Sequence, residues 1–123
     1  MLVTVPLGVL KSGRIAFEPP LPQYKQVAIQ KVPMGCVNKF LLIWDSCFWD
    51  KEQYICYTAE QKDKFNYFIN IKYGLPQVNA LMTFAYADYS RETEFMSDPE
   101  IVEEIMKHLR DMYGDSIPYP KNM

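Results

Sequence analysis

The chain has 123 residues, of which 49% are hydrophobic, 15% aromatic and 23% charged, and its formal net charge is −2. This composition is typical of one globular domain and excludes a disordered or repetitive chain. No basic patch favours nucleic-acid binding. No run approaches the ~20 apolar residues that would span a bilayer, so we expect no membrane partner.

Three cysteines occur, without a C-x-x-C pair: Cys36, Cys47 and Cys56. An odd number in this spacing argues against a disulfide framework and against a metal site. Reduced thiols are typical of an intracellular protein, and we expect a cytoplasmic one. The first residues have neither the positive region nor the long apolar stretch of a signal peptide.

The first third of the chain predicts short elements separated by prolines. Residues 2–5 and 15–17 favour short strands, ended by Pro6 with Gly8 and by Pro19 with Pro20. Ser12-Gly13 indicates a turn. Pro22 favours the start of a helix that runs to about Lys31, because proline is tolerated in the first helical turn.

Residues 34–44 predict the longest strand. Successive strand side chains point to opposite faces, and here both faces are mostly apolar. This pattern is typical of a central strand that is covered on both sides. Asn38 and Lys39 are its polar exceptions.

The remaining elements indicate an α+β fold with a mixed or antiparallel sheet flanked by helices. Further strands are predicted at 54–57, 65–71 and 80–87, with turns at 60–63 and 74–76 and a short helix over 88–94. The final helix begins at the capping box of Ser97 and Glu100 and ends at Gly114. The only histidine, His108, lies on this helix as a surface or boundary residue.

Lys39 has two interpretations. An ammonium buried without a partner is costly, so a buried lysine either loses its proton or is held by a fixed partner, and it can then position a water or act as a base. Alternatively, its long stem reaches out from a sheet edge and keeps the ammonium in water, which is the commoner case.

Four motifs follow one another in the first half of the chain, and two more lie near its end. They are Thr4-Val5-Pro6-Leu7-Gly8-Val9-Leu10-Lys11, Phe17-Glu18-Pro19-Pro20-Leu21-Pro22, Asn38-Lys39, Phe48-Trp49, the segment from Ser97 to Glu104, and the segment from Leu109 to Gly114. In this order the chain resembles the flavin-containing amine oxidases, which include polyamine oxidases, monoamine oxidases and lysine-specific histone demethylases. The resemblance covers roughly residues 2–120 and is greatest for the polyamine oxidases.

The resemblance implies roles for individual residues. Lys39 matches a family lysine that holds a water near flavin N5, Thr4 and Pro6 match a segment beside the flavin, and Asn38 could orient the lysine or be an ordinary core amide. Tyr67, Phe68 and Tyr86 would form an aromatic substrate wall, although such stripes are more often plain core. Some relatives have a tryptophan near the position of Ile69, so the substrate does not carry over.

The same resemblance implies a reaction and a cofactor. A hydride would pass from the carbon beside an amine nitrogen to FAD, which gives an imine that is then hydrolysed. The sequence has no G-x-G pair, so the turn that binds a dinucleotide pyrophosphate is absent. We therefore expect one domain over 1–123, in which residues 1–11 resemble the link from the FAD-binding domain and 12–123 the substrate-binding domain.

Three hypotheses for function follow. The first is the substrate-binding segment of an amine oxidase, inactive without a missing flavin-binding domain and not binding FAD alone. The second is a stand-alone module that binds a small molecule or a protein, and the third is a remnant without function. In each case an unpaired strand at residues 2–5 would favour a homo-oligomer through strand exchange.

Overall fold

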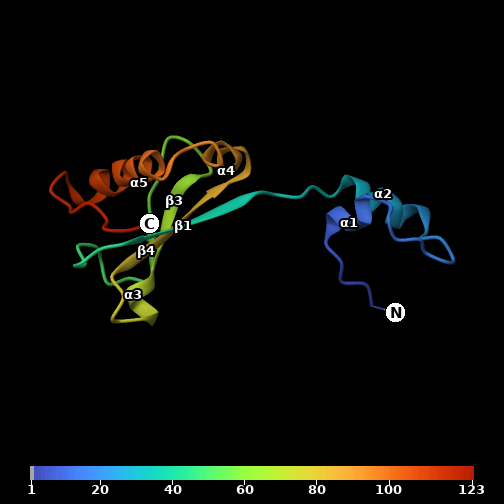
Figure 1. Ribbon diagram of the computed structural model, residues 1–123, viewed down its shortest axis with the longest axis horizontal. Coiled ribbons are helices and arrows are strands. Elements are labelled where there is room, and N and C mark those ends of the chain that lie inside the picture. Colours follow the sequence, from blue (N-terminus) through green and yellow to red (C-terminus); the bar gives the residue numbers. More distant parts are fainter. Residues whose placement is uncertain (1) are drawn as a thin grey trace. The chain divides into compact units, whose positions relative to one another are not determined.

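The computed structural model describes residues 2–123, which fall into two compact units that divide between Gly35 and Cys36 (Figure 1). The first unit contains helices α1 (Leu7–Lys11) and α2 (Gln23–Lys31). The second unit contains the strands β1 (Val37–Ile43), β2 (Tyr54–Cys56), β3 (Lys64–Asn70) and β4 (Ala80–Tyr86), and the helices α3 (Ile71–Gly74), α4 (Ala87–Thr93) and α5 (Asp98–Tyr113).

In the first unit each helix follows a proline, Pro6 before α1 and Pro22 before α2. The helix predicted after Pro22 and the turn at Ser12-Gly13 are confirmed, and Gly13 has the positive φ of 66° that favours glycine. The predicted strands at 2–5 and 15–17 are wrong, because neither segment pairs with another strand. A strand needs a partner for its backbone groups, and the sequence pattern does not reveal whether one exists.

The second unit is built on an antiparallel four-stranded sheet in the order β1-β4-β3-β2. Together with its helices, this sheet confirms the predicted α+β class. The prediction that the strand around Lys39 is central is wrong, because β1 forms an edge of the sheet. Apolar residues on both of its faces indicated burial, yet one face is open in this chain.

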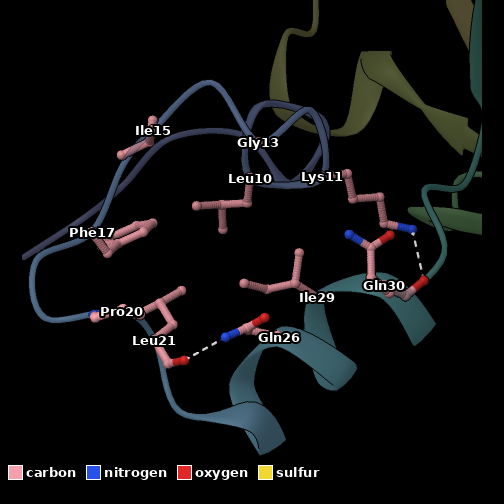
Figure 2. A pocket seen from close by; sticks show the side chains of 10 residues that line it. All are labelled: Leu10, Lys11, Gly13, Ile15, Phe17, Pro20, Leu21, Gln26, Ile29 and Gln30. Carbon is pink, nitrogen blue, oxygen red and sulfur yellow. Dashed lines mark hydrogen bonds between the residues drawn. The ribbon is translucent and has the colours of Figure 1, made fainter.

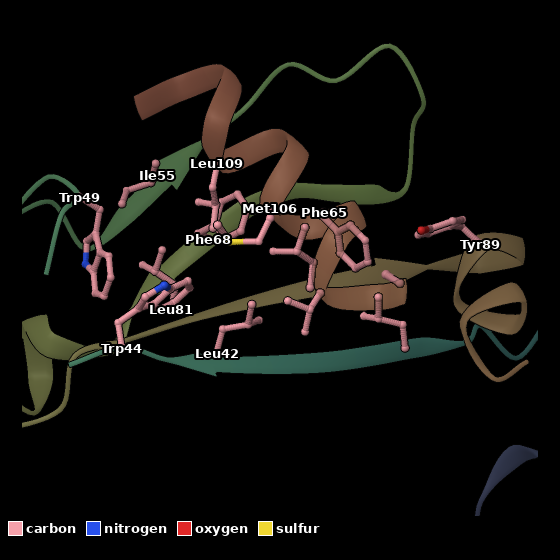
Figure 3. Close-up of a cluster of buried hydrophobic side chains, with 14 residues drawn as sticks. Leu42, Trp44, Trp49, Ile55, Phe65, Phe68, Leu81, Tyr89, Met106 and Leu109 are labelled. Atoms are coloured by element: carbon pink, nitrogen blue, oxygen red, sulfur yellow. The ribbon is translucent and has the colours of Figure 1, made fainter. Parts of the chain in front are cut away.

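One face of the sheet packs against α5 and forms the hydrophobic core (Figure 3). Leu42, Phe68 and Leu81 from the sheet meet Met106 and Leu109 from the helix. Each of these five side chains is at most 1% exposed. Burial of such side chains contributes roughly 1.5–3 kcal/mol each, so α5 holds the sheet together from this side.

Helix α5 has the ends that the sequence predicts. The carboxylate of Glu100 accepts hydrogen bonds from the backbone N–H and the hydroxyl of Ser97, both at 2.7 Å, and Gly114 ends the helix with φ of 86°. The short helix after β4 is also confirmed, as α4. None of the described helices is both long and apolar enough to cross a membrane.

Strand β3 contains an irregularity that changes which side chains reach the core. Its register against β4 shifts between Lys64 and Phe68, and Phe65 has a positive φ of 48°. As a result, Phe65 and Phe68 are both fully buried in the core, although simple alternation would place them on opposite faces. Tyr67 lies between them and points to the other face.

Candidate functional site

The face of the sheet that α5 does not cover is open and mostly apolar. Residues directly opposite each other in an antiparallel pair share a face, so the register defines its members. They are Val37, Lys39, Leu41 and Ile43 of β1, Ala80, Met82, Phe84 and Tyr86 of β4, Tyr67 and Ile69 of β3, and Tyr54 and Cys56 of β2. We call this set the open face.

Lys39 is the one charged side chain on the open face. It lies directly opposite Phe84 across β1 and β4. The four strands contain no aspartate or glutamate, so no carboxylate of the sheet neutralises it. Of the two interpretations of Lys39, burial does not apply to this chain, because its side chain is exposed. The interpretation that keeps the ammonium in water therefore applies here.

Three aromatic rings form a cluster next to Lys39. The ring of Phe84 lies nearly parallel to those of Tyr67 and Tyr86, with centroid distances of 5.2 and 5.9 Å. The Tyr86 hydroxyl donates to the Tyr67 hydroxyl at 3.1 Å. Burial, followed by this hydrogen bond, raises the pKa of Tyr86 to about 12, so its hydroxyl keeps its proton at neutral pH. The cluster thus offers an aromatic surface with a neutral hydroxyl pair.

Two of the predicted substrate contacts lie on the opposite face. Phe68 is 0% exposed and belongs to the core under α5. Asn38 donates from Nδ2 to the Ser90 carbonyl oxygen and to Thr93 Oγ1, each at 3.0 Å, and to Glu94 Oε1 at 2.6 Å. The structure therefore does not bring Asn38 and Phe68 together with Lys39, and the core interpretation that the sequence left open applies to both.

Thr4 and Pro6, the predicted neighbours of the cofactor, belong to the first unit and are both exposed. The Pro6 carbonyl oxygen accepts the N–H groups of Val9 at 2.9 Å and Leu10 at 3.3 Å, which starts α1. Thr4 lines a shallow hollow with neighbours that include Phe17 and Pro19. Neither residue has a contact that would make it a binding residue by itself.

The first unit also has a small hollow, lined by apolar and polar residues, that the sequence did not indicate (Figure 2). Its volume is about 260 Å³. Leu10, Phe17 and Ile29 point into it, and the ammonium of Lys11 donates to the Gln30 carbonyl oxygen at 3.3 Å on its rim. A second hydrogen bond joins two residues that line the hollow: Gln26 Nε2 donates to the Leu21 carbonyl oxygen at 2.6 Å.

Within the described part of the chain, no group of three or more histidine, cysteine, aspartate or glutamate residues could hold a metal ion. Cys36, Cys47 and Cys56 are free thiols. His108 is half-buried, and its Nδ1 lies 3.4 Å from the Phe65 carbonyl oxygen. Burial lowers the pKa of His108, so the ring is neutral at pH 7.

Sequence reasoning missed Phe84, which lies opposite Lys39 and stacks on both tyrosines of the cluster. The pattern of residues 80–87 predicted a strand but not its partner, and only the pairing of β1 with β4 makes Phe84 the neighbour of Lys39. Leu41 and Met82, which pair next to them on the open face, were missed for the same reason.

Comparisons with known proteins agree on one family. The model of the flavin containing amine oxidoreductase family matches residues 1–123. Polyamine oxidase 4 of Oryza sativa subsp. japonica is 34% identical over 94% of this chain, and polyamine oxidase 2 of Arabidopsis thaliana is 33% identical over 95%. Lysine-specific histone demethylase 1 homolog 3 of Arabidopsis thaliana is 37% identical over 98% of this chain. The chain spans 23%, 24% and 8% of the lengths of these relatives, respectively.

Proposed function

The chain belongs to the family of flavin-containing amine oxidases, and from this premise we propose that it forms the substrate-facing segment of an FAD-dependent amine oxidase. A bound flavin supplies the two-electron oxidation of the carbon beside an amine nitrogen. The chain spans only 23% of the length of the first relative, so the remaining parts of the active site would come from a flavin-binding domain outside these 123 residues.

The observation that carries this proposal is Lys39, the one charge on an otherwise apolar and aromatic face. When a second domain covers such a face and removes bulk water, the electrostatic interactions of the ammonium become stronger. Its Nζ can then hold a water by donating a hydrogen bond, or pass a proton to it. This is the role that the resemblance implies for the family lysine.

Tyr67 and Tyr86 are the proposed contacts for the amine substrate. Aromatic faces attract both the carbon chain of an amine and its cationic nitrogen. The neutral hydroxyl pair adds one O–H donor and acceptor lone pairs at the edge of the cluster. Asn38 and Phe68 support this wall from the core side and do not touch the substrate in this proposal. Two of the relatives are polyamine oxidases by name, so a polyamine is the first substrate to test.

The residues present fit a wall of the flavin site and not the whole site. The sequence has no G-x-G pair to bring backbone N–H groups onto a pyrophosphate. We therefore do not expect residues 1–123 to bind FAD alone, and we assign the phosphate contacts to the missing domain. Thr4 and Pro6 remain the proposed neighbours of the flavin in the first unit.

A segment exchange tests the proposal. Residues 1–123 replace the matching segment of Arabidopsis polyamine oxidase 2, and the flavin content is measured from visible absorbance. Flavin reduction by spermine is then followed with Lys39, Lys39→Met, Lys39→Arg and the control Lys62→Met, which changes an exposed turn lysine. We expect Lys39→Met to slow the reaction on the order of 10²-fold per bound flavin, as loss of a proton-transfer group does. Unchanged rates would remove the role of Lys39.

We also propose that isolated chains self-associate, but through another surface than residues 2–5. Residues 2–5 form no strand, so strand exchange there lacks its basis. The open face, with Val37 50% and Leu41 41% exposed, is the surface on which isolated chains would meet. Light scattering over a broad concentration range distinguishes a monomer from such an oligomer.

A further inference from the structure

The C-terminal segment of the chain already pairs with one end of the β1 edge. The N–H of Ile43 donates to the Asn122 carbonyl oxygen and the N–H of Lys121 to the Ile43 carbonyl oxygen, both at 2.9 Å. This bridge is antiparallel. The indole N–H of Trp44 donates to the Pro118 carbonyl oxygen at 2.8 Å and fixes the segment in place. The segment thus runs beside β1 in a defined direction.

The rest of the β1 edge has backbone groups that point away from the sheet. In an antiparallel strand, the backbone groups of alternate residues point to opposite edges. The N–H of Trp44 donates to Asn79 and the carbonyl oxygen of Cys36 accepts from Ala87, so even-numbered residues bond toward β4. Val37, Lys39 and Leu41 are odd-numbered like Ile43, so their backbone N–H and C=O groups point away from β4, as those of Ile43 do. Among the described residues, no backbone hydrogen bond to another segment reaches these groups.

This free edge has the properties of a strand-addition site. β1 has seven residues without a proline, whereas the strand at the other edge, β2, has only three. Short strands and prolines protect sheet edges, and β1 has neither protection. Main-chain hydrogen bonds to such an edge are a common means of binding an extended peptide.

We propose that the β1 edge binds an extended polypeptide segment that is joined directly to Met123 and runs antiparallel to β1. In the register of the Ile43–Asn122 bridge, the first, third and fifth added residues would lie opposite Leu41, Lys39 and Val37. We choose this occupant because Lys121 and Asn122 already pair with Ile43. A segment that continues from them would have its direction and its first hydrogen bonds to β1 in place. The first relatives are about four times as long as this chain, so proteins of this family have polypeptide to supply such a strand.

A second copy of the chain fits the edge less well. A symmetric antiparallel pair of β1 strands centred on Lys39 places two ammonium groups directly opposite each other, which is destabilising. A pairing shifted toward Ile43 meets Lys121 and Asn122, which already occupy that end. A pairing shifted the other way uses residues before Val37, where β1 ends.

The added strand would hold the backbone of Lys39 from its second side. The N–H and C=O of Lys39 would then both be bonded, and the side chain would start from a fixed point on the open face. This inference does not depend on flavin chemistry, because it concerns backbone pairing alone.

Amide hydrogen exchange measured by NMR tests the proposal. The 123-residue chain is compared with a chain extended after Met123 by Thr-Val-Thr-Val-Thr. The matched control extension, Pro-Val-Pro-Val-Pro, lacks the N–H groups that would donate to Leu41, Lys39 and Val37. Within β1 of the 123-residue chain, we expect protected amides at Asn38, Phe40, Leu42 and Ile43, and fast exchange at Val37, Lys39 and Leu41. The threonine extension should slow exchange at Val37, Lys39 and Leu41 by about tenfold or more, and the proline extension should not.

Other results would overturn the proposal. Equal exchange at Val37, Lys39 and Leu41 in all three chains would show that the edge accepts no strand. Protection that grows with the concentration of the 123-residue chain would make a second copy the occupant. Equal protection by the free Thr-Val-Thr-Val-Thr peptide, added at the concentration of the chain, would remove the need for continuity with Met123.

Discussion

The side-chain amide of Asn38 lies 2.6 Å from the carboxylate of Glu94, so the residue before Lys39 is tied to the end of α4. The same amide donates to the Ser90 carbonyl oxygen and to Thr93 Oγ1. Ser90 and Thr93 are 0% and 4% exposed. Asn38 and Lys39 are consecutive residues on opposite faces, so one secures β1 against the body of the unit while the other remains free on the open face.

Replacement of Asn38 should destabilise the second unit. Asn38→Ala removes the donor for the buried Ser90 and Thr93 oxygens, and we expect the free energy of unfolding in urea to fall by about 1–3 kcal/mol. Lys39→Ala is the matched control and should change stability by less than about 0.5 kcal/mol, because its side chain is exposed. Equal effects of the two substitutions would contradict this assignment.

A second prediction concerns Asn70, which is 4% exposed. Its Oδ1 accepts the indole N–H of Trp49 at 3.0 Å, and its Nδ2 donates to the carbonyl oxygens of Asp50 at 3.2 Å and Glu52 at 3.0 Å. Asn70→Ala leaves the buried N–H of Trp49 and two part-buried carbonyl oxygens without this partner, and we expect a loss of about 3 kcal/mol in urea unfolding. Trp49→Phe removes the N–H together with part of the buried ring, so a double-mutant cycle with Asn70→Ala separates the coupling of the two side chains from the packing that Trp49→Phe alone loses.

The stability of the second unit should depend on pH through His108. Burial lowers the pKa of this ring from 6.5, while Lys64 lowers it further and the Phe65 carbonyl oxygen, Asp111 and Glu104 partly oppose the shift. The unfolded state therefore takes up the proton first as the pH falls. Stability should be complete above pH 6.5, decrease as the pH falls below it, and stop changing below the lowered pKa.

Urea unfolding of the wild-type chain between pH 5 and 8, beside His108→Gln, measures this effect. The variant should have a flatter dependence on pH in this range. The carboxyl groups of Glu100 and Glu104 also have lowered pKa values, so their contributions are present above pH 4.5 and lost below it, in a separate window. An identical slope in both chains between pH 5 and 8 would exclude His108 as its source.

The capping box of α5 gives a fourth prediction. Ser97→Ala removes the hydroxyl that donates to Glu100 and should cost about 1 kcal/mol of stability. Ser97→Asp keeps an N-cap acceptor but places a second carboxylate beside Glu100, so it should recover only part of the loss. Thermal unfolding followed by circular dichroism measures both. A loss as large for Ser116→Ala, an exposed serine outside the helix, would point to a nonspecific cause.

Local patterns predicted the second half of the fold well, because its signals are short-range. The box of Ser97 and Glu100, the helical repeat of apolar residues and Gly114 define α5 without reference to any other element. The strands β2, β3 and β4 were also predicted near their observed positions. These elements depend on neighbours within a few residues, and the sequence displays those directly.

The errors arose where structure depends on distant partners. Residues 2–5 have the composition of a strand but no partner to pair with, and β1 has apolar residues on a face that nothing in the second unit covers. Tyr67 and Phe68 were both assigned to the substrate wall from the resemblance, but consecutive residues of a strand point to opposite faces, and the pairing with β4 places Phe68 on the core face. The candidate site itself depends on the pairing of Lys39 with Phe84, which no local pattern contains.

The absence of acidic residues from the sheet has a consequence for the behaviour of this chain during folding. Segments with high β propensity and no charge are prone to form fibrils when they are exposed, and β4 contains no charged residue at all. Lys39 and Lys64 are the charges within the four strands, so each acts as a gatekeeper against ordered aggregation. Lys39→Met should therefore shorten the lag time of thioflavin T fluorescence more than Lys39→Arg does, whatever the lysine contributes to chemistry.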